Sequence, residues 1–114
     1  MTEVRLRRSG KYELTAKGHA TGSTEVCAAI SCLLYAAAGW LRNYGEADVI
    51  ELDSGNVTLR WHGGESAKVL YDLLEIGFLQ LELSAKEYIK VNTGNGGDIP
   101  ARATHGGDTP AITK

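Results

Sequence analysis

Apolar and polar positions alternate at the start of the chain, on both sides of a Ser-Gly pair. Residues Val4 to Arg8 alternate apolar and basic side chains, and the alternation resumes from Lys11 to Lys17. A period of two on both sides of a turn predicts a β-hairpin. The same pattern returns at residues 47–52 and 56–62 around an Asp-Ser-Gly turn, so we predict a second hairpin there.

Each predicted hairpin is followed by a segment with helical features. Residues 25–43 are apolar on nearly every side, with Thr24 as the expected N-cap, Glu25 in the first turn and Gly45 just past the end. A helix of this kind must be covered on more than one side, so we expect the sheet on one face and a second helix or a partner subunit on another. The second helix is predicted over residues 65–83, from an i, i+3/i+4 stripe. That stripe consists of Val69, Leu70, Leu73, Leu74, Gly77, Phe78 and Leu81.

A last short strand is predicted at residues 88–91, which gives the order ββαββαβ. Two helices with about five strands predict an α+β fold, a two-layer sandwich with a mixed sheet. Beyond Asn92 the chain is rich in Gly, Thr and Pro and nearly free of large apolar residues. It cannot bury enough surface to offset its ordering entropy. We therefore divide the chain into a domain over residues 1–92 and a flexible tail over residues 93–114, and expect His105 in the tail to be inert.

Length and charge restrict the function classes. The 114 residues suffice for one domain with a single core, and the net charge of −2 provides no general attraction for nucleic acid or an anionic membrane. The basic side chains Arg5, Arg7, Arg8 and Lys11 are expected to lie solvated along the first hairpin. The opening residues MTEVRLRR do not resemble a signal peptide, and the longest apolar stretch, Val26 to Leu41, is shorter than a membrane span needs. We expect a cytoplasmic protein that binds neither nucleic acid nor a membrane.

The two cysteines and His62 give no indication of a metal site or of a disulfide. Cys27 and Cys32 lie roughly 140° apart around one helix, which disfavours a disulfide between them. Cys32 is expected in the core, and His62 is expected to be exposed at a strand end. No Cys or carboxylate lies at metal-ligand spacing from His62, so we expect neither a metal nor a cofactor.

Cys27 is the residue with the most chemistry. A cysteine in the first turn of a helix lies near free backbone N–H groups and the positive end of the helix dipole, which favour the thiolate. A loop with two glycines could fold His19 back over it as a base, and the N–H groups of Cys27 and Ala28 could hold an oxyanion. This spacing alone leaves open that Cys27 is a buried structural cysteine, since free cysteine is often a small core residue.

Two short motifs carry a resemblance to a known family. Gly18-His19-Ala20, then a glycine-bearing loop, then Cys27 to Ser31 (CAAIS) at a helix start resembles the ribosomal-processing cysteine protease (Prp) family, whose signature pairs G-H-A with C-A-A-V-S. The order of elements, Gly77-Phe78 late in the second helix and the strand at Tyr88 to Val91 are also similar. The resemblance covers about residues 1–92.

The resemblance implies a cysteine endopeptidase without a cofactor. By it, His19 is the general base and Cys27 the nucleophile, with Gly18, Ala28 and Ser31 in supporting positions. No Asp or Asn position identifies itself as a third member, so a dyad is expected. The family removes an N-terminal extension from a large-subunit ribosomal protein, and its members resemble homodimers, which would also explain an apolar first helix.

Two departures set this chain apart from the typical member. The loop between His19 and Cys27 is several residues shorter, and the family's acidic residue three before the cysteine is Thr24 here, with Glu25 one place later. A divergent or phage-encoded relative that cleaves another protein fits these differences. Two other hypotheses remain open: a non-catalytic dimeric binding module that keeps the fold, and a thiol redox sensor that uses both cysteines.

Overall fold

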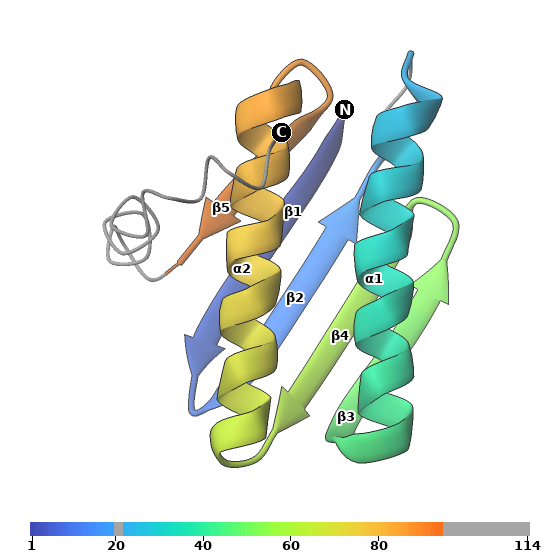
Figure 1. The fold of residues 1–114 in the computed structure, drawn as a ribbon. Coiled ribbons are helices and arrows are strands. Elements are labelled where there is room, and N and C mark those ends of the chain that lie inside the picture. Colours follow the sequence, from blue (N-terminus) through green and yellow to red (C-terminus); the bar gives the residue numbers. More distant parts are fainter. Residues whose placement is uncertain (20–21, 95–114) are drawn as a thin grey trace.

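Two β-hairpins, each followed by a helix, and a final strand make up the described chain (Figure 1). The computed structural model describes residues 1–19 and 22–94. The elements are β1 Thr2–Ser9, β2 Lys11–Lys17, α1 Thr24–Tyr44, β3 Glu46–Asp53, β4 Asn56–His62, α2 Glu65–Ala85 and β5 Ile89–Thr93. The predicted order ββαββαβ is confirmed. Strand β5 reaches one residue past the predicted end of the domain, and the predicted tail from residue 95 onward, with His105, lies outside the described residues.

The five strands form one mixed sheet in the order β3-β4-β2-β1-β5. Strands β1 and β5 pair in parallel, and the other three pairs are antiparallel. Both helices lie on the same face of this sheet (Figure 1), which gives the predicted two-layer α+β sandwich. The opposite face carries the polar half of each alternating strand.

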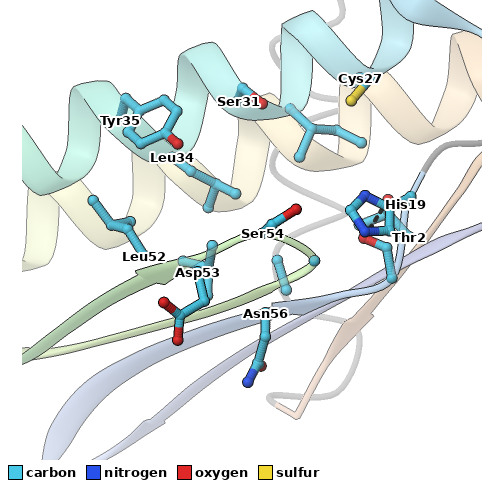
Figure 2. A pocket seen from close by; sticks show the side chains of 15 residues that line it. Thr2, His19, Cys27, Ser31, Leu34, Tyr35, Leu52, Asp53, Ser54 and Asn56 are labelled. Atoms are coloured by element: carbon cyan, nitrogen blue, oxygen red, sulfur yellow. Dashed lines mark hydrogen bonds between the residues drawn. The ribbon is translucent and has the colours of Figure 1, made fainter.

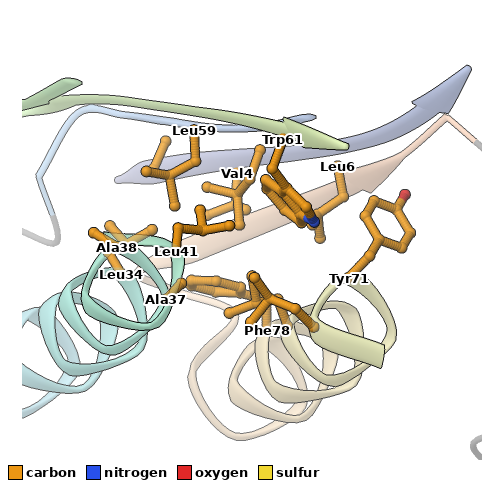
Figure 3. Packing of buried hydrophobic residues seen from close by; sticks show 14 of the residues in the cluster. Val4, Leu6, Leu34, Ala37, Ala38, Leu41, Leu59, Trp61, Tyr71 and Phe78 are labelled. Carbon is orange, nitrogen blue, oxygen red and sulfur yellow. The ribbon is translucent and has the colours of Figure 1, made fainter. Parts of the chain in front are cut away.

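The core lies between the sheet and the two helices (Figure 3). Each element contributes the apolar half of its pattern: Val4, Leu6, Leu14, Leu59 and Trp61 from the strands, Leu34, Ala37, Ala38 and Leu41 from α1, and Tyr71, Leu74 and Phe78 from α2. The indole N–H of Trp61 donates to the carbonyl of Ala67 at 3.1 Å, so this ring is buried without losing its hydrogen bond.

Both ends of α1 differ from the prediction. The N-cap lies one residue earlier, and the glycine after the helix has another conformation than expected. The N-cap is Ser23 and not Thr24, because the Ser23 hydroxyl accepts from the Val26 N–H at 3.2 Å. At the other end, Gly45 follows the helix in an extended conformation and not in the left-handed one. A glycine is needed there for space: a Cβ at Gly45 would lie 2.8 Å from the Trp40 ring and 2.9 Å from a Leu41 methyl.

The predicted apolar stripe of α2 is too wide. Leu70, Leu74 and Phe78 are buried, whereas Val69 and Leu73 are 53% and 63% exposed. With the exposed Ile76 and Leu83, these two residues form a separate apolar line on the solvent side of α2, which we call the α2 seam (Val69, Leu73, Ile76 and Leu83). Gly77 lies 3.4 Å, measured from an ideal Cβ, from a Leu33 methyl of α1, so the helices approach each other here as predicted.

Helix α1 is longer than the apolar stretch that the sequence indicated. By length and composition alone its 21 residues could cross a membrane, a test that the core helix of a soluble protein also passes. Here α1 packs on the sheet through Ile30, Leu34, Ala37, Ala38 and Leu41. Among its large apolar side chains, Tyr35 and Tyr44 are exposed.

Candidate active site

A pocket of about 250 Å³ lies between the first half of α1, the end of β2 and the turn of the β3–β4 hairpin (Figure 2). His19 and Cys27 both line it. One part of the wall is polar, formed with them by Thr2, Ser31, Asp53, Ser54 and Asn56. The other part is apolar, formed by Ala16, Ile30, Leu34, Tyr35, Leu52 and Val57. The fold therefore brings the thiol and the imidazole that the sequence indicated to one concave site.

The backbone in front of His19 is held by two separate segments, the start of the chain and the β3–β4 turn. The Gly18 N–H donates to the Gly55 carbonyl at 3.0 Å, and the Thr2 hydroxyl donates to the Gly18 carbonyl at 3.4 Å. A Cβ at Gly18 would lie 2.5 Å from the Met1 carbonyl oxygen, and the φ of +92° also favours glycine. This glycine therefore fixes the point from which His19 leaves the sheet.

The ring of His19 lies directly against the β3–β4 turn. An ideal Cβ on Gly55 would be 2.5 Å from Nε2 and 3.1 Å from Cε1 of His19. The ring thus occupies the space that any side chain at residue 55 would need. Gly55 was not among the site residues that the sequence indicated, although its place in a predicted turn was clear.

Cys27 is exposed and carries a free thiol on the first turns of α1. The interpretation of Cys27 as a buried structural cysteine is therefore wrong. Its side chain borders a second, shallow depression together with Gly22, Ser23, Thr24 and Glu25, the residues that begin the helix. The thiol thus lies between the main pocket and the first turn of α1.

The backbone N–H of Cys27 is not free to hold an oxyanion. It donates to the Ser23 carbonyl at 3.2 Å, which is the first bond of the helix ladder. The N–H groups of Thr24 and Glu25 come earlier in the first turn, where helix geometry leaves no intrahelical partner. The expectation that the Cys27 N–H could hold an oxyanion is therefore wrong, because the helix starts one residue earlier than predicted.

The other predicted site residues divide into two groups. Ser31 lies one turn after Cys27 and lines the pocket, and its hydroxyl has no hydrogen bond within residues 1–19 and 22–94. Ala28 is exposed and does not line the pocket, so its position supports the site only through the helix.

Cys32 is exposed and not in the core, which corrects the prediction. The buried side of α1 is set by Ile30, Leu34, Ala37 and Leu41, and residue 32 lies on the other side of the helix from Ile30. Both cysteines are free thiols in the structure.

Sequence reasoning missed the contribution of the β3–β4 hairpin. Asp53, Ser54 and Asn56 all line the pocket, and in Figure 2 the Ser54 hydroxyl points toward α1. Lys17, the last residue of β2, pairs with Asn56 of β4, and this pairing brings the β3–β4 turn beside Gly18. The sequence indicated both strands, but it carried no signal for their pairing, which is what places the turn at the site.

His62 lies at the other end of β3 and β4, in an ion-paired cluster. Its Nε2 is 2.9 Å from Glu46 Oε1, its Nδ1 is 3.1 Å from Asp48 Oδ2, and Lys11 Nζ is 3.6 Å from the same Asp48 oxygen. The hydrogen bond with His62 lowers the pKa of Asp48 below its ordinary value of 3.8, with help from the charges of His62 and Lys11. No group of three metal-binding side chains occurs in the part of the chain that the structure describes.

Comparisons with known proteins agree with this picture. The sequence matches the family described as cysteine protease Prp over residues 1–90. The structure is similar to the essential ribosomal processing protease Prp from S. aureus, solved with a substrate peptide and with a covalently linked product peptide. In each case the TM-score is 0.71 at 21% identity, over 82% of this chain and 99% of that one.

A further similar structure is SMU.848 from Streptococcus mutans, with a TM-score of 0.65 at 18% identity, over 82% of this chain and 93% of that one. A comparison with curated proteins found no match. At these identities the structural likeness supports the α+β fold, and the family match over residues 1–90 covers both motifs and both helices. The chain therefore belongs to the cysteine protease Prp family.

Proposed function

We propose that Cys27 and His19 form the catalytic dyad of this cysteine protease. The observation that carries the proposal is that an exposed thiol and an exposed imidazole line one pocket in a member of a cysteine protease family. The His19 side chain makes no hydrogen bond to a carboxylate or amide within the described residues. A dyad is therefore the simplest arrangement that fits.

The proposed reaction has two steps. The Cys27 thiolate attacks the scissile carbonyl carbon, and the first-turn N–H groups of Thr24 and Glu25 hold the oxyanion that forms. The carbon–nitrogen bond then breaks while protonated His19 gives its proton to the leaving amine, which leaves an acyl-enzyme. Water, deprotonated by His19, hydrolyses the thioester and restores the thiol.

The proposed substrate is a short extended segment of a protein. The apolar part of the pocket, with Ile30, Leu34 and Leu52, suits an apolar side chain next to the scissile bond. We infer that the enzyme removes an N-terminal segment from a ribosomal or another protein, because its similar structure from S. aureus is a ribosomal processing protease solved with a peptide. Such a substrate implies that the protein acts in the cytoplasm.

We also propose that the protein is a homodimer joined along the α2 seam. Its residues lie at 69, 73, 76 and 83, and Gln80 completes a spacing of four, three, four and three, which is the spacing that a facing helix fills. The α2 helix of a second copy therefore fits the seam about a two-fold axis.

The dyad is tested by mass spectrometry of a proteome-derived peptide pool incubated with the wild type, Cys27→Ala and His19→Ala. We expect cleavage by the wild type alone and unchanged cleavage by Cys32→Ala, which removes the other exposed thiol of the same helix. Iodoacetamide should also react faster with Cys27 than with Cys32, and His19→Ala should remove that difference. Cleavage by Cys27→Ala would overturn the dyad, and a function that survives Cys27→Ser would favour the binding module.

A further inference from the structure

Strand β3 forms one edge of the sheet and ends at the active-site pocket. It pairs only with β4 among the described strands, so the backbone groups of its other side face outward. Its last residues, Leu52 and Asp53, line the pocket together with His19 and Cys27. An extended chain that lay along this edge would therefore run into the catalytic site.

We propose that the free edge of β3 is the docking surface for an extended, basic segment of the substrate next to the scissile bond. The segment adds as a sixth strand, and its main-chain hydrogen bonds supply affinity. This inference rests on the proposed protease function and deepens it, because it names where the substrate binds outside the pocket and which charge it carries.

The ladder between β3 and β4 limits the length of this surface. A register shift between Ala47 and Val49 bends the first half of β3, whereas residues 49–53 pair regularly with β4. A bulge of this kind disrupts strand pairing locally. The regular part of about five residues spans about 17 Å, enough for a segment of similar length.

The charges of β3 give the class of the segment. Four of its eight residues are acidic and none is basic: Glu46, Asp48, Glu51 and Asp53. Glu46 and Asp48 contact His62, and Lys11 also lies near Asp48. Glu51 and Asp53 are exposed and have no ion pair within residues 1–19 and 22–94. They lie on the regular part of the strand, nearest the pocket.

The spacing of these two free carboxylates predicts a pattern in the substrate. Residues two apart on a strand point to the same face, so Glu51 and Asp53 lie in one row. A segment paired with β3 would place side chains opposite them at two positions that are also two apart. We therefore expect Lys or Arg at alternating positions on one side of the scissile bond.

Exposed edge strands also invite aggregation, and proteins often protect them with charge, most often with lysine. If the acidic residues of β3 only protected the edge from aggregation, charge of either sign would serve, and no substrate preference would depend on it. The proposal differs because it predicts a preference that changes sign when the charge of β3 is reversed.

The first experiment uses pairs of synthetic dodecapeptides that the wild type cleaves and that differ only in Lys or Glu at the two alternating positions. We expect each Lys to raise kcat/KM about 1.5- to 5-fold over Glu, mainly through KM, as for cross-strand charge pairs. Glu51→Lys and Asp53→Lys should reverse the preference. Glu3→Lys is the matched control, because it makes the same charge change on β1, which is paired on both sides. The ratio of two peptides does not depend on the amount of folded enzyme.

A second measurement tests the main-chain pairing. Single N-methylation along the peptide removes one N–H at a time, and pairing with β3 predicts slower cleavage at every second position. Loss with a period of two supports the proposal, on whichever side of the scissile bond it occurs. A preference unchanged by both charge reversals, or an N-methyl profile without a period of two, would overturn the docking surface while the cleavage itself still established the protease. Absence of any cleavage by the wild type would instead overturn the proposed function.

Discussion

The His19 ring and Gly55 are in contact across the mouth of the pocket, so that a methyl group on Gly55 would reach to 2.5 Å from Nε2. The two residues lie 36 positions apart in the sequence, and the N–H of Gly18, the residue before His19, donates to the Gly55 carbonyl. The turn of one hairpin thus sets the position of a side chain that follows the other.

Gly55→Ala should lower kcat by about 10- to 100-fold, because a displacement of about 1 Å at a catalytic group has effects of this size. The matched control is Gly10→Ala, which shares a positive φ (+80° against +73°) but has open space around its Cβ. Both variants should lose similar stability to urea, and only Gly55→Ala should lose activity. Equal activity of the two variants would show that Gly55 does not position His19.

Ser23→Ala should lower the free energy of unfolding by about 1 kcal/mol, since it removes the side-chain acceptor of the α1 N-cap. Thr24→Ala should change it by a few tenths of a kcal/mol at most, because Thr24 is an exposed first-turn residue. Urea unfolding followed by circular dichroism measures both. A larger loss of unfolding free energy for Thr24→Ala than for Ser23→Ala would show that Thr24 is the N-cap, as the sequence indicated.

The Asp48 cluster should make stability depend on acid pH. The pKa of Asp48 is lowered in the folded protein, so its ionised form stabilises the fold above pH 3.8 and this contribution is lost as the pH falls through the folded pKa. The stability gap between the wild type and Asp48→Asn should therefore be larger at pH 5 than at pH 2.5. Urea midpoints at the two pH values check this, and a gap that widens on acidification would contradict it.

Leu73→Glu should dissociate the proposed dimer, because it puts a charge in the α2 seam at a residue that is already 63% exposed and costs the monomer little. Sedimentation should show the wild type as a dimer and Leu73→Glu as a folded monomer. Ala36→Glu tests the exposed side of α1 in the same way. If Ala36→Glu dissociates the dimer and Leu73→Glu does not, the interface lies on α1.

The strands that the sequence predicted best are those bounded by turn residues. Lys11 to Lys17 and Asn56 to His62 begin and end where the alternation does, because a Ser-Gly and an Asp-Ser-Gly turn fix their limits. The first turn of α1 was harder, since Ser23 and Thr24 are both good caps and only the Val26 N–H distinguishes them.

The candidate site was predictable only in part. The motifs indicated His19 and Cys27, and the fold brings both to one pocket, although their chemical assignment stays a prediction. Asp53, Ser54 and Asn56 were not indicated, because their place depends on which strands pair and not on local pattern. Cys32 shows the same limit for burial: a helix that is apolar all round does not reveal which of its sides meets the core.

The parallel pair of β1 and β5 joins the first strand of the chain to the last. Thr2 donates its N–H to the Tyr88 carbonyl at 2.9 Å and its hydroxyl to the Gly18 carbonyl, so the residue before His19 depends on a contact with the end of the domain. During synthesis, the contacts that hold Thr2 and Gly18 beside His19 are therefore completed only after residues 89–93 have left the ribosome. The complete set of contacts at Thr2 therefore requires a chain that reaches the last strand of the domain.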